Sequence, residues 1–285
     1  MRINPRSENR LLAALSEKEY DHLHSRMEHV SMPIREILYT PGEPIRHIYF
    51  PLNSVATLLV IMEDGSSVEV GVIGNEGMVG IPVFWGVQTT PHQVVVLIPG
   101  GASKLPAQDL KELLDFKDSS LHGLLLRYTH ALVSCISQTA ACNRLHPING
   151  RLSRWLLVSH DRAGADDFPL THDFVADLLG CRRAGVSEAA SFLKEEKLID
   201  YHRGRVIILD REGLESLSCE CYEIVKQSFD YYLGVITQQP ARQAALSTKQ
   251  FADLGSAVRG NIRTDLPTYK KRVNKTFSAS LLNKP

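Results

Sequence analysis

The stretch from residue 171 to residue 188 constrains the fold more strongly than any other part of the sequence. It opens on Thr171, whose hydroxyl can accept a hydrogen bond from a free amide in the first turn of a helix. Ala176 is small where a second helix must cross, and Gly180 supplies the tight turn between the two helices. Val186 begins the apolar face of the second helix. These residues at this spacing predict a helix-turn-helix.

The second helix of such a motif inserts its N-terminal part into the major groove of DNA. The side chains on the face opposite Val186 are therefore predicted to read bases, and they are Arg182, Arg183, Ser187 and Glu188. An arginine can bridge the O6 and N7 acceptors of guanine, and a glutamate can accept from the amino group of cytosine.

A β-hairpin wing is predicted after this motif, because the apolar runs 198–201 and 206–209 flank a basic turn. Positive side chains at its tip suit phosphate contact, which contributes affinity without sequence information. The side chains expected at the DNA backbone are Thr171, His172, His202, Arg203 and Arg205. The alternative is a helical bundle with a surface hairpin. Residues 150–211 contain ten basic and ten acidic residues, so DNA affinity must come from clustered charge.

The N-terminal part of the chain has a different pattern. Residues 8–30 carry apolar side chains at helical spacing and predict an amphipathic helix. Between residues 34 and 98, short β-rich runs are separated by turn signals, which continue to Gly100-Gly101. Asp64-Gly65 is the strongest hairpin signal, since a type I′ turn requires positive φ at its centre. Many short strands at this spacing predict a β sandwich or roll.

A long helix is predicted after Asp118, and His146-Pro147 should end it because proline cannot donate the helical hydrogen bond. Its apolar and small residues alternate in steps of four and three, which is the seam of a coiled coil. This seam is expected to form a dimer interface, and it consists of Leu121, Leu125, Tyr128, Leu132, Cys135, Thr139 and Cys142. The alternative is a helix that packs against its own β domain.

The predicted fold class is α+β, with an N-terminal double-stranded β-roll, a long dimerisation helix and a C-terminal winged helix-turn-helix. The expected boundaries are 1–117 for the β-roll sensor, 118–146 for the dimerisation helix, 147–217 for the DNA-binding domain, 218–234 for a C-terminal helix and 235–285 for a tail. From Pro240 onward the tail contains nine basic and two acidic residues. It is expected to be disordered, either as a solubilising segment or as a non-specific phosphate contact.

Composition and patterning exclude several classes of protein. Hydrophobic residues make up 44% of the chain and charged residues 22%, which is typical of a globular protein. No apolar run reaches the roughly 18 residues that cross a bilayer, and the N-terminus lacks a signal peptide. A cytoplasmic protein without a membrane partner is therefore expected. No nucleophile lies beside a base at a recognised spacing, so neither an enzyme nor a cofactor is expected.

The five cysteines are scattered, which argues against a disulfide framework. Cys219 and Cys221 lie closer together than the usual zinc ligands, and no second pair matches them, so no metal site is expected. We interpret both as packing residues of a helix over 217–233. His146 belongs to no recognisable ligand cluster. Cys181, at the start of the second helix, is either a thiol activated by the helix dipole or a small buried residue.

The chain resembles the Crp/Fnr family of bacterial transcription regulators over about residues 8–217. The order of the parts matches, as do the stretches 179–183 (Leu-Gly-Cys-Arg-Arg) and 193–199 (Leu-Lys-Glu-Glu-Lys-Leu-Ile). The resemblance implies a homodimer that binds a two-fold symmetric site in double-stranded DNA, contacts RNA polymerase and responds to an unidentified signal. The alternative is a β-roll ligand-binding or protein-interaction module whose degenerate helix-turn-helix binds no DNA.

The recognition helix departs from the family's pattern of an arginine, a glutamate and a second arginine. Arg183 matches the first position, whereas Ala184 and Glu188 stand at the other two. The family's usual half-site is therefore not expected.

The sensor departs further. Members that bind cyclic nucleotides hold the ribose and phosphate with a Gly-Glu and an Arg-Ser pair, where this chain has Gly80-Ile81 and Pro91-His92. No arginine lies between Arg46 and Arg127. A buried phosphate needs a charged partner, so cyclic AMP binding is not expected. The N-terminal cysteine cluster of oxygen-sensing members is absent too.

Overall fold

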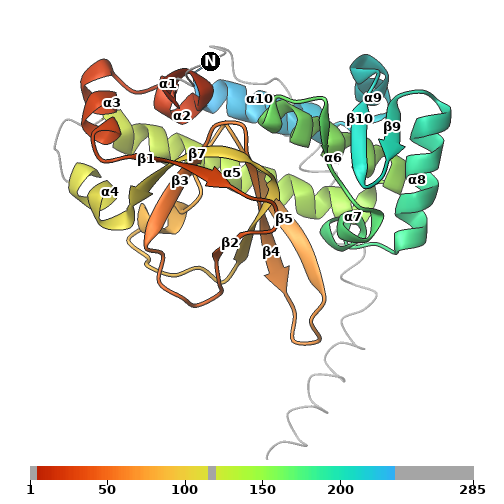
Figure 1. Cartoon of the computed structure of the whole chain (residues 1–285), viewed down its shortest axis with the longest axis horizontal. Helices are drawn as coiled ribbons and strands as arrows, with labels where there is room; N and C mark the ends of the chain where they lie inside the picture. Colours follow the sequence, from red (N-terminus) through yellow and green to blue (C-terminus); the bar gives the residue numbers. More distant parts are fainter. Residues whose placement is uncertain (1–4, 115–119, 235–285) are drawn as a thin grey trace, which may run out of the picture. The chain divides into compact units, whose positions relative to one another are not determined.

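The computed structural model describes residues 5–114 and 120–234 (Figure 1). The predicted basic tail therefore lies outside the described residues. Within the two described ranges, no helix is long and apolar enough to cross a membrane.

The N-terminal segment contains three short helices where one was expected: α1 (Pro5–Glu8), α2 (Arg10–Ala13) and α3 (Glu17–His24). Two capping side chains divide it, because Asn9 accepts from the amide of Leu12 and Ser16 forms a capping box with Glu19. Residues 28–32 are a strand. The single helix over 8–30 was therefore a wrong prediction.

Two antiparallel sheets follow, as the sequence predicted for a double-stranded β-roll. One sheet has the order β1-β7-β3, formed by Glu28–Met32, Gly100–Pro106 and His47–Pro51. The other has the order β2-β6-β4-β5, formed by Ile37–Tyr39, Gln93–Ile98, Val55–Ile61 and Ser67–Ile73. A 3₁₀ turn, η1 (Ile81–Val83), and helix α4 (Ala107–Leu114) complete this part. Gly100-Gly101 was expected to be a turn, but it opens β7 and pairs with β1.

The β4–β5 hairpin forms at Asp64-Gly65, although the predicted turn type is wrong. Gly65 has a φ of 82°, whereas Asp64 is not among the described non-glycine residues with positive φ. Met62 and Ser66 are hydrogen-bonded, and Asp64 Oδ1 accepts from the Ser66 amide at 2.9 Å. The three-residue loop thus places only its glycine in the left-handed region.

The predicted coiled-coil seam on α5 (Ser120–Leu145) is buried within the chain itself. Tyr128 is 0% exposed, packs against Phe229, and bonds the backbone of Met78. All seven seam side chains are buried, namely Leu121, Leu125, Tyr128, Leu132, Cys135, Thr139 and Cys142. The structure corrects their assignment to a dimer interface, because a helix side chain enclosed by its own chain has no surface left for a partner.

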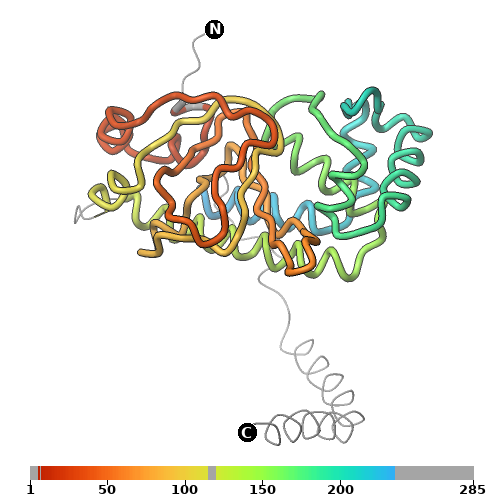
Figure 2. The backbone as a smooth tube through the Cα atoms, turned by 60° about the horizontal axis from the view of Figure 1, so that its bottom comes forward, coloured from red at the N-terminus to blue at the C-terminus, as the bar shows by residue number. Residues whose placement is uncertain are grey.

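The C-terminal part begins at Pro147, the N-cap of α6 (Ile148–Ala163). Its remaining elements are β8 (Asp167–Pro169), α7 (His172–Leu179), α8 (Arg183–Glu195), β9 (Ile199–His202), β10 (Arg205–Ile208), α9 (Arg211–Leu217) and α10 (Cys221–Tyr232). The sheet has the order β8-β10-β9, and β8 was missed by the sequence analysis. Helix α10 lies alongside α5 (Figures 1 and 2).

A buried polar network joins α6 to the β-roll. Trp155 Nε1 donates to Glu69 on β5 at 3.0 Å. Arg162 Nε lies 3.0 Å from Glu76, and its Nη1 donates to the Val72 carbonyl. Burial raises the pKa of Glu69 to about 7, partly opposed by a hydrogen bond from Thr57. Helix α6 and the β-roll therefore contact each other through buried polar groups, and a buried polar group is destabilising when it has no hydrogen-bond partner.

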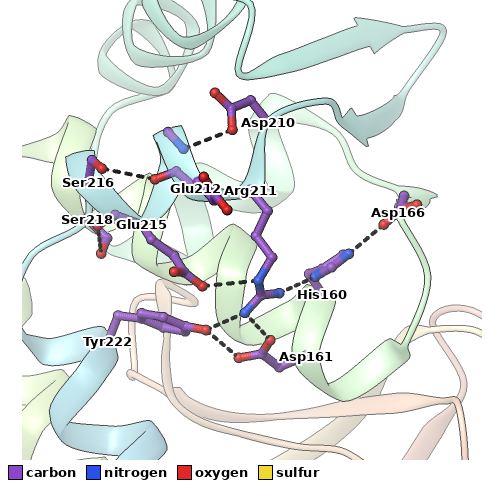
Figure 3. Close-up of polar contacts among 11 residues, drawn as sticks. His160, Asp161, Asp166, Asp210, Arg211, Glu212, Glu215, Ser216, Ser218 and Tyr222 are labelled. Atoms are coloured by element: carbon purple, nitrogen blue, oxygen red, sulfur yellow. Dashed lines mark hydrogen bonds and ion pairs between the residues drawn. The ribbon is translucent and has the colours of Figure 1, made fainter.

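A second polar network, centred on Arg211 at the start of α9, joins α6 and α10 (Figure 3). Its guanidinium pairs with Asp161 at 2.6 Å and with Glu215 at 3.0 Å. It also donates to the hydroxyl of Tyr222 and to His160. The beginning of α10 is thus fixed relative to α6.

Candidate nucleic-acid interface

The helix-turn-helix forms where the sequence predicted it, from α7 to α8. Thr171 is the N-cap of α7 and accepts from the Phe174 amide. Gly180 ends α7 with φ 57° and ψ 46°, a left-handed conformation that favours glycine. Ala176 and Val186 are buried where the helices meet.

The N-terminal part of α8 presents three of the four proposed base-reading side chains to solvent. Arg182, Arg183 and Glu188 are exposed, and Arg183 Nε forms an ion pair with Asp173 at 3.2 Å. Ser187 is half-buried, and its hydroxyl is hydrogen-bonded to His172 Nδ1 at 3.0 Å. The arginines thus lie on a surface that a duplex can reach.

Four further exposed residues on α8 were not proposed from the sequence: Ala184, Ser191, Lys194 and Glu195. Ala184 and Ser191 extend the outer face by the same helical spacing that places Glu188 there. That periodicity could have found them.

The proposed backbone contacts fall into two groups. His202 and Arg203 are exposed at the wing tip, where Arg203 and Gly204 have φ of 48° and 75°. Two consecutive residues with positive φ are what a type I′ turn requires. Arg205 is also exposed but pairs with Asp167 at 2.8 Å.

The other group lies at the start of α7. The hydroxyl of Thr171 caps the helix, and the ring of His172 packs on Tyr201 with centroids 4.5 Å apart. Burial and the charge of Arg183 lower the pKa of His172 below its usual value. Both effects disfavour the charged form of the imidazole, and its Nδ1 lies 3.0 Å from the Ser187 hydroxyl.

Cys181 lies in the turn before α8 and is half-buried. Burial raises the pKa of its thiol, although the nearby Arg151 opposes this effect. The structure therefore favours the interpretation as a small packing residue over that of an activated thiol.

The β-roll residues at the family's nucleotide-binding positions do not fit a cyclic phosphate. Gly80 has a φ of 109°, and a Cβ there would lie 2.6 Å from Ile48 Cγ2. Ile81 is buried among apolar side chains. The backbone of His92 donates to Thr90, and burial lowers the pKa of the His92 imidazole. These positions supply no charge-assisted partner for a phosphate.

Two family models match the chain. Residues 29–116 match a cyclic nucleotide-binding domain, and residues 150–217 match a Crp-like helix-turn-helix domain. The two occur in this order on one chain. The chain is a Crp/Fnr-family regulator. In this Crp/Fnr regulator the helix-turn-helix is a DNA-binding element of transcription control.

Relatives and solved structures agree with this assignment. The Crp/Fnr regulator is 24% identical over 183 residues to the global nitrogen regulator of Nostoc sp., covering 60% of this chain and 80% of the relative. The structure of FixK2 from Bradyrhizobium japonicum is 16% identical, with a TM-score of 0.58, covering 68% of this chain and 98% of that one. A CRP-family regulator from Thermus thermophilus is 19% identical, with a TM-score of 0.55, covering 67% and 96%. At these identities the structures establish the fold.

Proposed function

We propose that the chain is a cytoplasmic homodimer that reads a two-fold symmetric DNA site, one half-site per recognition helix, and changes its binding when the β-roll receives a signal. The observation that carries this proposal is the exposed N-terminal part of α8, with Arg182 and Arg183 beside a basic wing tip. We divide the chain as the sequence suggested, into a sensor, a long helix, a DNA-binding domain, a C-terminal helix and a tail.

Base reading is assigned to Arg182, Arg183 and Glu188, with Ser187 held in place by His172. An arginine that bridges guanine contributes about 1–3 kcal/mol of discrimination. The phosphate contacts are assigned to His202, Arg203 and Arg205 at the wing, with the α7 N-terminus facing the backbone at Thr171 and His172.

The dimer contact is assigned to the outer stripe of α5. Leu126 is 52% exposed and Val133 is 50% exposed, seven residues apart on one helix face. Thr129 lies between them and accepts from Trp85 Nε1 at 3.2 Å, and Trp85 is itself half exposed. An apolar helical stripe of this kind supports packing against the same stripe of a second copy.

A signal at the β-roll could reach the recognition helix through α6. Trp155 and Arg162 bind Glu69 and Glu76 in the network described above, and a valine of β5 lies against the turn at Gly180. RNA polymerase is proposed as the partner of the DNA-bound dimer, by analogy with the family. The proposed signal is a small molecule or a protein that binds the β-roll, and no enzyme activity is proposed for the chain.

Selection of bound DNA from a random pool tests the proposal directly. A two-fold symmetric consensus with half-sites about 34 Å apart is expected, with binding that weakens linearly in the logarithm of salt concentration. Absence of any retained sequence at low salt would favour the alternative, a β-roll module that binds no DNA.

Two matched arginine variants separate base reading from phosphate contact. Arg183→Ala should cost about 1–3 kcal/mol and relax one position of the consensus. Arg203→Ala should weaken binding uniformly across sequences and lower the salt slope by about one. If Arg183→Ala leaves the consensus unchanged, Arg183 reads no base.

A further inference from the structure

Four potential metal ligands converge where α5 ends and α10 begins. Cys142 and His146 stand one helical turn apart at the end of α5, while Cys219 and Cys221 flank the start of α10. Their ligand atoms all lie within 4.8 Å of one another. As whole residues, Cys142 and Cys221 are buried, whereas His146 and Cys219 are partly exposed.

Two of the ligand separations are close to those of a tetrahedral zinc centre. Bonds of about 2.3 Å to sulfur and about 2.0 Å to nitrogen place tetrahedral ligands about 3.8 Å apart for two sulfurs and about 3.5 Å for sulfur and nitrogen. In the structure, the Sγ atoms of Cys142 and Cys219 are 3.5 Å apart. Cys221 Sγ and His146 Nδ1 are 3.4 Å apart. These two separations differ from the tetrahedral values by a few tenths of an ångström. The remaining pairs lie within 4.8 Å, so small side-chain movements would bring all four ligands to the ion.

The surrounding groups are arranged as they are around protein-bound metals. His146 points Nδ1 toward the sulfurs, while its Nε2 lies 3.3 Å from the carboxylate of Glu220. A histidine that ligates a metal almost always donates its other ring N–H to such a partner. Gln138 Nε2 donates to Cys221 Sγ at 3.0 Å, which stabilises a thiolate there. This hydrogen-bonding pattern is an observation separate from the ligand distances.

We propose that Cys142, His146, Cys219 and Cys221 form a closed Cys₃His site for one Zn²⁺ per chain. Four protein ligands leave no open position, which is the composition of a structural and not a catalytic zinc site. Binding deprotonates three thiols and releases their protons, with no change of oxidation state. Arg154 Nη2 donates to the Thr139 hydroxyl, one helical turn before Cys142, so its positive charge offsets part of the net negative charge of the three thiolates and the ion.

Two other uses of these residues fit the geometry less well. An iron–sulfur cluster interposes several atoms between its cysteine ligands and therefore needs them farther apart than these four lie. A disulfide between Cys142 and Cys219 would leave Cys221, His146 and the Glu220 contact without a role.

The sequence analysis missed this site because its ligands come from distant segments. The signal that could have found it is the i, i+4 pair Cys142 and His146, which a helix places on one face. The proposal does not depend on DNA binding, and measurements of metal binding alone can test it.

Metal titration of the purified full chain, reduced and stripped with a chelator, tests the proposal. One Co²⁺ per chain should bind with the visible bands of tetrahedral cobalt and a thiolate charge-transfer band, and one Zn²⁺ should displace it. Zn²⁺ should also protect three of the five cysteines from a thiol reagent. An octahedral cobalt spectrum, or five thiols that react alike with and without Zn²⁺, would overturn the proposal.

Variants at the site provide the matched comparison. Glu220→Gln keeps all four ligands and should weaken Zn²⁺ about 10–100-fold. Cys219→Ser and Cys221→Ser should weaken it more, whereas Cys181→Ser, outside the cluster, should leave it unchanged. Unchanged affinity in the Cys219→Ser, Cys221→Ser double variant would refute the site. If the isolated protein contains a disulfide, and the protein binds no Zn²⁺ after that disulfide is reduced, the cysteines act in redox chemistry and not as zinc ligands.

Discussion

Replacing Glu69 by glutamine should remove a pH dependence of folding stability that the wild-type chain carries. Glu69 is 5% exposed, and burial raises its pKa from 4.5 to about 7 against the opposing effects of Thr57, Arg154 and Trp155. Because the folded-state pKa is raised, the folded chain binds this proton more tightly than the unfolded chain. The stabilisation is therefore complete below about pH 4.5 and is lost as the pH rises through about 7.

The size of the effect follows from the two pKa values. A tenfold difference in proton affinity corresponds to about 1.4 kcal/mol, so the shift from 4.5 to about 7 is worth about 3 kcal/mol. Glutamine stays neutral, and its amide oxygen can still accept from Trp155 Nε1. The free energy of unfolding of Glu69→Gln, measured relative to wild type, should thus rise by about 3 kcal/mol between pH 4.5 and pH 8.

Denaturant unfolding at several pH values, followed by tryptophan fluorescence and circular dichroism, measures this difference. Glu63→Gln is the matched control, because Glu63 is exposed on the neighbouring hairpin loop and should show no such change. If the difference in the free energy of unfolding between Glu69→Gln and wild type is the same at pH 5 and pH 8, the Glu69 side chain is ionised in a solvated site. The described contact between α6 and the β-roll would then be incorrect.

Three further outcomes are expected. Gly180→Ala should lower the free energy of unfolding by about 1–2 kcal/mol in a denaturant titration, because φ is 57° there; an unchanged value would contradict the turn geometry. Asp173→Asn should tighten DNA binding several-fold in a low-salt gel shift, since it frees Arg183 and removes a negative charge near the duplex; weaker binding would count against this orientation. Leu126→Asp should convert the proposed dimer to a folded monomer, seen as a lower sedimentation coefficient with an unchanged circular dichroism spectrum, and a persistent dimer would exclude the outer stripe of α5.

The helix-turn-helix could be predicted because its determinants are local. Thr171, Gly180 and Val186 lie within one short stretch, and each acts on the turn or helix that contains it. The wing was predictable for the same reason, since its turn depends on Arg203 and Gly204 alone.

The partner of the α5 seam could not be predicted in this way. Helical periodicity identifies the buried face of a helix but not the element that covers it. Here the covering elements are the β-roll and α10, whose Phe229 packs against Tyr128 from 101 residues away in the sequence. The proposed zinc ligands could not be grouped from the sequence for the same reason, because Cys142 and Cys219 are 77 residues apart.

The return of α10 to α5 limits how the DNA-binding domain can move. The domain is joined to α5 through Pro147 at its start, and again through α10 at its end, where the Arg127 side chain of α5 donates to the Tyr232 carbonyl. Arg10 of α2 also pairs with Asp230 of α10. A domain attached at one point can rotate about that point, whereas a domain attached at two points along α5 cannot rotate without breaking one of the two contacts. Under the proposed signalling, any reorientation of the recognition helix relative to the β-roll therefore has to move α10 against α5 as well.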